Sequence, residues 1–142
     1  GKTDFKNDSE AQFKKNLEDV NTYVDIISVH LYKKKDNARF NNTDAVELLT
    51  LTKQYADTIG KPLFVGEFGD TNFKTDQGSY IIKMMDHITM LKIPYSAIWV
   101  WELYHKNSRK EQSIERDIFS LEPGKTDDII SRLKNKNNDI MN

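Results

Sequence analysis

The sequence predicts an α/β fold in which amphipathic helices alternate with three strands of a parallel sheet. Three short apolar runs, VDIISVHLY (24–32), KPLFVGEFG (61–69) and YSAIWVWEL (95–103), are rich in β-branched and aromatic residues and too short for helices. The segments between them carry apolar residues spaced by threes and fours. Strands that alternate in this way with helices indicate parallel pairing with right-handed crossovers. Both a doubly wound sheet and part of a (β/α)8 barrel fit this pattern.

The first half of the chain is expected to hold two helices and one strand. Residues 9–20 predict a helix that buries Phe13, Leu17 and Val20. Residues 25–31 predict the first strand, and a polar loop follows. The second helix is expected to be capped by Thr43. It ends at Gly60 and Pro62, because glycine readily closes a helix and proline cannot continue one.

The second half continues the alternation. Residues 63–68 predict the second strand, and the helix after it has an apolar stripe made of Ile81, Met84, Met85, Ile88 and Leu91. Pro94 precedes the third strand. The polar residues 105–116 predict a long loop. A last helix follows the EPGKTDD segment, and its tail over residues 134–142 is expected to fray.

Composition excludes several classes of function. A formal net charge of −1 gives no basic footprint for nucleic acid. The absence of cysteine rules out disulfides, thiolate metal sites and a cysteine nucleophile. No apolar stretch approaches the ~20 residues of a membrane span. Gly1 in place of an initiator Met suggests a processed or engineered start. We expect an extracytoplasmic protein that is secreted, periplasmic or surface-anchored.

Each predicted strand ends in polar or aromatic side chains on one face. Side chains alternate along a strand, which gives the faces Ser28, His30 and Tyr32; Leu63, Val65 and Glu67; and Ala97, Trp99 and Trp101. In parallel α/β folds active sites form at the carboxyl ends of the strands. No glycine-rich phosphate loop joins a strand to a helix, which disfavours a nucleotide binder. A site is therefore predicted at this end of the sheet.

These three segments, in this order and spacing, resemble strands six, seven and eight of clan A glycoside hydrolases. The closest resemblance is to family 5, the cellulase and β-mannanase group. His-x-Tyr at His30 and Tyr32, the Glu of GEFG and the Trp on the last strand carry it together. The resemblance covers essentially the whole chain but only the C-terminal half of such an enzyme. It implies that residues 1–142 are the C-terminal half of a (β/α)8 barrel.

The resemblance also implies roles for the residues at the strand ends. Glu67 corresponds to the nucleophile of a retaining mechanism, and Tyr32 is expected to hydrogen-bond to it. His30 is expected to line the cleft and help orient the catalytic carboxyl groups. Trp101, or otherwise Trp99, would be the surface on which a sugar stacks. The enzyme would hydrolyse β-linked glucan or mannan and would need no metal or other cofactor.

One part of the family pattern is missing. The general acid/base of the family is a Glu at the end of strand four in an Asn-Glu-Pro context, and no Asn-Glu-Pro occurs here. Glu102 has the wrong parity, and Glu122 follows Leu121 where the Asn should stand. The isolated chain is therefore expected to be poorly active or inactive.

A half-barrel would expose two strand edges, which are open to pairing with another chain. We therefore expect a homo-oligomer or an association with the missing N-terminal half-barrel, and an oligosaccharide or polysaccharide as ligand. Two other interpretations stay open. One is a non-catalytic carbohydrate-binding or structural remnant of such an enzyme, and the other is an unrelated parallel α/β interaction domain.

Overall fold

The computed structural model describes residues 8–32, 44–70, 78–100, 104–107, 113–116, 121, 124 and 126–141. These residues form an α/β fold around a three-stranded parallel sheet in the order β1-β2-β3. Its strands are β1 (Ile27–Leu31), β2 (Leu63–Phe68) and β3 (Tyr95–Ile98). The helices among the described residues are α1 (Glu10–Asn21), α2 (Ala45–Thr58), α4 (Ser79–Met90) and α5 (Asp127–Met141). The predicted α/β class and parallel pairing are confirmed.

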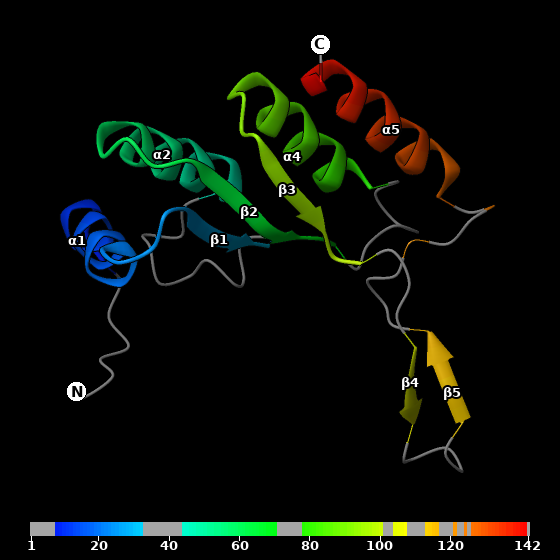
Figure 1. Ribbon diagram of the computed structural model, residues 1–142. Helices are drawn as coiled ribbons and strands as arrows, with labels where there is room; N and C mark the ends of the chain where they lie inside the picture. The colour runs from blue at the N-terminus through cyan, green and yellow to red at the C-terminus, as the bar shows by residue number, and fades with distance from the viewer. Residues whose placement is uncertain are drawn as a thin grey trace.

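The helices divide the sheet into a covered face and an open face. Figure 1 shows α2, α4 and α5 side by side over one face of the sheet, with α1 beside the β1 edge. None of these four helices covers the other face, which we call the open face. None of the described helices is both long enough and apolar enough to span a membrane.

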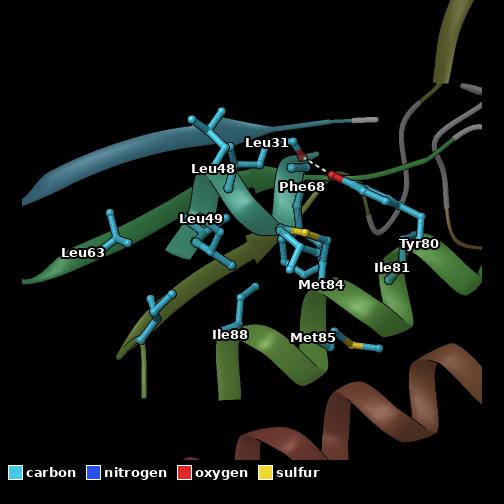
Figure 2. Close-up of a cluster of buried hydrophobic side chains, with 14 of the residues drawn as sticks. Leu31, Leu48, Leu49, Leu63, Phe68, Tyr80, Ile81, Met84, Met85 and Ile88 are labelled. Atoms are coloured by element: carbon cyan, nitrogen blue, oxygen red, sulfur yellow. Dashed lines mark hydrogen bonds between the residues drawn. The ribbon is translucent and has the colours of Figure 1, made fainter. Parts of the chain in front are cut away.

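The hydrophobic core lies between the covered face and helices α2 and α4. Leu31, Leu63 and Phe68 reach it from the strands, and each is at most 1% exposed. Figure 2 shows them packed against side chains from the two helices, namely Leu48, Leu49, Ile81, Met84, Met85 and Ile88. Full burial of one such side chain contributes about 1.5–3 kcal/mol. This layer therefore holds the strands in register.

Strict alternation fails in β2, and the expected face for this strand is wrong. Leu63 and Val65 are buried under the helices, whereas Gly66 and Glu67 are both only partly buried. The reason is a β-bulge: Val29 pairs with Val65, but the next residue, His30, pairs with Glu67. Two residues of β2 thus oppose one residue of β1, which reverses the parity after Val65.

Three smaller expectations about the helices are also corrected. Asp44, not Thr43, is the N-cap of α2, and Thr43 itself lies outside the described residues. Val20 is 72% exposed, because α1 turns Leu17 and Asn21 toward the protein instead. The tail over residues 134–142, expected to fray, is helical as far as Met141.

The polar stretch predicted as a loop contains a hairpin. β4 (Tyr104–Asn107) and β5 (Ser113–Arg116) pair antiparallel, with Tyr104 opposite Arg116. Figure 1 shows this pair apart from the three-stranded sheet. The pairing is between backbone groups, and hydrophobic periodicity does not reveal it.

Asp44 links two of the covering helices. Its carboxylate accepts a hydrogen bond from the Val46 N–H at 2.7 Å and lies 3.4 Å from Lys83 Nζ on α4. Burial raises the pKa of Asp44, but the Val46 hydrogen bond and the charges of Lys83 and His87 outweigh it. The pKa of Asp44 is therefore held below its ordinary value.

We predict that Asp44→Ala lowers the free energy of unfolding by about 1 kcal/mol at pH 7, as loss of an N-cap does. A depressed folded pKa adds stability above the unfolded pKa of about 3.9, and this is lost as pH falls through the folded value. Urea unfolding should therefore show a smaller difference near pH 2. Asp19→Ala, which removes an exposed i,i+4 pair with Lys15, is the control and should change little. An equal loss at both pH values would contradict this account.

The sheet also predicts self-association. The outer edges of β1 and β3 have no strand partner among the described residues, and Tyr23 near the start of β1 is 98% exposed. Unpaired parallel edges favour pairing with another chain. We expect light scattering over a micromolar concentration series to show oligomers. A stable monomer throughout the series would refute this prediction.

Candidate functional site

Three of the predicted site residues meet at the carboxyl end of the parallel sheet. The Tyr32 hydroxyl donates a hydrogen bond of 2.6 Å to Oε2 of Glu67. Nδ1 of His30 lies 3.3 Å from the same oxygen. The three side chains come from two neighbouring strands and from the residue that follows β1. The expectation that they converge is met, while their roles stay predictions.

The bulge in β2 makes this cluster possible. In a regular ladder His30 would face Gly66, and Glu67 would point to the covered face. The bulge pairs His30 with Glu67 and turns the carboxylate to the open face. The Glu67 side chain is 28% exposed and that of His30 is 55% exposed. The carboxylate is thus partly shielded yet reachable from solvent.

The two oxygens of Glu67 have different surroundings. Both Tyr32 and His30 approach Oε2. No described residue donates a hydrogen bond to Oε1. Hydrogen bonds that involve a carboxylate are stronger than neutral ones and fix its orientation. The arrangement therefore anchors Oε2 and fixes the orientation of the carboxylate.

Gly66 provides the space in which the His30 ring lies. A Cβ at residue 66 would stand 2.9 Å from Ser28 Oγ and 3.0 Å from His30 Nε2. The distance to Ser28 Oγ is shorter than a Cβ tolerates and the distance to His30 Nε2 is at the limit, so a larger residue would displace the Ser28 hydroxyl and press on the His30 ring. The absent side chain thus lets His30 lie across β2 with its other nitrogen toward Glu67.

The two tryptophans differ in what the structure describes. Trp99 directly follows β3 and is partly buried, and its backbone N–H donates a hydrogen bond to the Phe68 carbonyl at 2.7 Å. This bond ties the end of β3 to the end of β2, next to Glu67. Trp101 lies outside the described residues.

Sequence reasoning missed two features of the site. It assigned Glu67 to the face of Leu63 and Val65, although it grouped Glu67 correctly with His30 and Tyr32. It also missed that the space beside Gly66 is used by the His30 ring. The adjacent Gly66-Glu67 pair at a strand end was the available signal for a bulge. Among the described residues there is no group of three or more His, Cys, Asp or Glu side chains placed to hold a metal ion.

No family model, curated protein or solved structure matches this chain.

The packing of Gly66 predicts a local effect of one methyl group. In Gly66→Ala the new Cβ should displace the Ser28 hydroxyl, whose oxygen is nearest, and push the His30 ring away from Glu67, because both side chains are easier to move than the strand. The Tyr32–Glu67 hydrogen bond should persist. The imidazole ¹⁵N resonances of His30 should shift, while the overall fold, measured by circular dichroism, is kept.

Gly60→Ala is the matched control. A Cβ at Gly60 meets nothing within 4 Å, but the residue has φ +67°. This variant should lose about 1–2 kcal/mol through backbone strain and leave the His30 resonances in place. Unchanged His30 resonances in Gly66→Ala would show that Gly66 does not set the position of the ring.

Proposed function

We propose that the chain is the C-terminal half-barrel of a retaining glycoside hydrolase that acts on β-linked glucan or mannan. The observation that carries the proposal is the geometry of Glu67. Its carboxylate stands at the carboxyl end of a parallel strand, on the open face, and accepts a 2.6 Å hydrogen bond from Tyr32. A solvent-reachable carboxylate held by a fixed donor suits a nucleophile.

The arrangement of helices supports a barrel segment rather than a doubly wound sheet. The strands are neighbours in chain order, and α2, α4 and α5 all cover the same face. A doubly wound sheet carries helices on both faces, whereas a (β/α)8 barrel keeps them outside and the strands' other face inside. The open face would then be the barrel interior, with the site at its carboxyl end.

In the proposed mechanism Oε1 of Glu67 attacks the anomeric carbon of the substrate. The bond from this carbon to the leaving oxygen breaks, and a glycosyl ester forms on Glu67. Tyr32 holds Oε2, so that the carboxylate keeps the orientation in which Oε1 faces the sugar. Water then attacks the anomeric carbon and releases Glu67, which gives overall retention.

The mechanism requires a second carboxyl group, and the sequence contains no Asn-Glu-Pro to supply it. The leaving oxygen needs a proton as the bond breaks, and retaining enzymes place the acid about 5–5.5 Å from the nucleophile. In the resembling family this acid lies on strand four, upstream of the segments present here. We therefore propose an N-terminal half-barrel as the partner, and an extracytoplasmic location where a polysaccharide is accessible.

The missing acid also favours a second candidate. The sequence has no Asn-Glu-Pro, so the chain could keep a carbohydrate-binding surface and perform no hydrolysis. In that case the partly buried Trp99 would contact sugar, and Glu67 would serve only as a hydrogen-bond acceptor. Hydrolysis by a completed assembly distinguishes the two functions.

We predict that the isolated chain hydrolyses glycosides very poorly. General acid catalysis contributes about 10²–10⁴-fold, and an incomplete cleft also loses substrate positioning. An aryl glycoside with a good leaving group needs less protonation and should show any residual activity first. The chain is assayed on this substrate and on soluble β-glucan and β-mannan, alone and with a matching N-terminal half-barrel.

Activity should rise on addition of the N-terminal half and disappear in Glu67→Gln. The exposed Asp128→Asn serves as a charge-matched control that should retain activity. Strong polysaccharide hydrolysis by the isolated chain would show that an acid lies within it and would contradict the half-site mechanism. Sugar binding without hydrolysis by the assembly would favour the non-catalytic function.

A further inference from the structure

A tyrosine of α4 holds the end of β1 directly behind the site. Tyr80, in the first turn of α4, donates a hydrogen bond of 3.1 Å from its hydroxyl to the carbonyl oxygen of Leu31. Figure 2 shows this bond on the side of the sheet that faces the core. Tyr80 is 9% exposed and Leu31 is 1% exposed. The hydrogen bond is therefore shielded from water, where breaking it leaves a buried carbonyl and costs most.

The Leu31 carbonyl has direct consequences for the next residue. It belongs to the same planar peptide unit as the N–H and Cα of Tyr32, so holding the carbonyl orients the backbone of Tyr32. Leu31 is the last residue of β1 and pairs with Phe68. Tyr32 thus lies one residue beyond the strand. The hydrogen bond from Tyr80 holds the residue just before it, Leu31.

The anchor itself is held in place. Ile81 and Met84, on the same helix as Tyr80, are fully buried in the core. Lys83 approaches Asp44 at the start of α2, 3.4 Å from its carboxylate. The first half of α4 is thus tied to the core and to a second helix, so the Tyr80 hydroxyl is a fixed point.

We propose that Tyr80 is a positioning residue for the Glu67 site. It acts through the Leu31–Tyr32 peptide and keeps the Tyr32 phenol where its hydroxyl reaches Oε2 of Glu67. Tyr80 is buried on the core side of the sheet and reaches the site only through this peptide. Its functional meaning rests on the nucleophile role proposed for Glu67, whereas its structural effect is measurable on the chain alone.

The test compares two tyrosines that each lose only a hydroxyl group. Tyr80→Phe removes the bond to Leu31. Tyr55→Phe is the matched control, because the Tyr55 hydroxyl on α2 is buried and has no hydrogen-bond partner in the described part of the chain. The chain is labelled with ¹³C at tyrosine Cζ, and the isotope shift of Cζ reports hydroxyl proton exchange. Tyr32→Phe assigns the resonance of Tyr32.

We expect Tyr32 hydroxyl exchange to become about fivefold faster in Tyr80→Phe, the effect of losing one typical hydrogen bond. It should stay unchanged in Tyr55→Phe. Replacing Tyr80 with 4-aminophenylalanine keeps a donor at the same position and should restore slow exchange. Equal exchange in the two Phe variants would overturn the proposal, as would failure of the amino analogue to rescue. If Tyr80→Phe does not fold, the amino analogue decides: protection of Tyr32 equal to wild type supports the proposal, and lost protection overturns it.

A second measurement separates this inference from the proposed function. In an active assembly with an N-terminal half-barrel, Tyr80→Phe should lower kcat and leave KM nearly unchanged, while Tyr55→Phe changes neither. Faster Tyr32 exchange in an assembly that hydrolyses nothing would retain the positioning role and reject the glycosidase. An active assembly with normal Tyr32 exchange in Tyr80→Phe would retain the glycosidase and reject the positioning role.

Discussion

The β-bulge at Gly66 and Glu67 is the constraint on which the site depends. Before it, Leu63 and Val65 point into the core, and after it Phe68 does so again. The bulge places two residues between these buried positions on the open face instead of one. A carboxylate can therefore stand at the end of a strand whose neighbouring residues are buried, without being buried itself. Desolvation of a charged Glu67 in the core would cost several kcal/mol.

Several residues around the bulge together hold the Glu67 carboxylate in place. Tyr32 and His30 contact Oε2 from the neighbouring strand, and Gly66 leaves the space in which the imidazole lies. Behind the sheet, Tyr80 fixes the peptide that leads into Tyr32. A site built on strand ends and supported from a helix is held more precisely than one built on loops. The core thus contributes to the site through backbone position as well as through stability.

The sequence predicted the fold class, the order of the three strands and the meeting of Tyr32, His30 and Glu67. Hydrophobic spacing indicates the strands and helices, because burial decides which segments become which. The meeting of Tyr32 with Glu67 was implied by the family resemblance. Hydrophobic spacing could not predict the face of Leu63 and Val65, since a bulge changes the register without changing composition. The β4–β5 hairpin and the Tyr80–Leu31 hydrogen bond were not predicted for a similar reason. Each depends on backbone pairing or on a tertiary contact that hydrophobic periodicity does not encode.

Covalent trapping tests the central claim most directly. A 2-deoxy-2-fluoro glycoside with an activated leaving group slows hydrolysis of a glycosyl ester more than its formation, so the ester accumulates on the nucleophile. After incubation with the assembled half-barrels, peptide mass spectrometry should find one glycosyl group on Glu67, and none when Glu67→Gln is used. A label on another residue, or turnover of a natural substrate without any label on Glu67, would contradict the account.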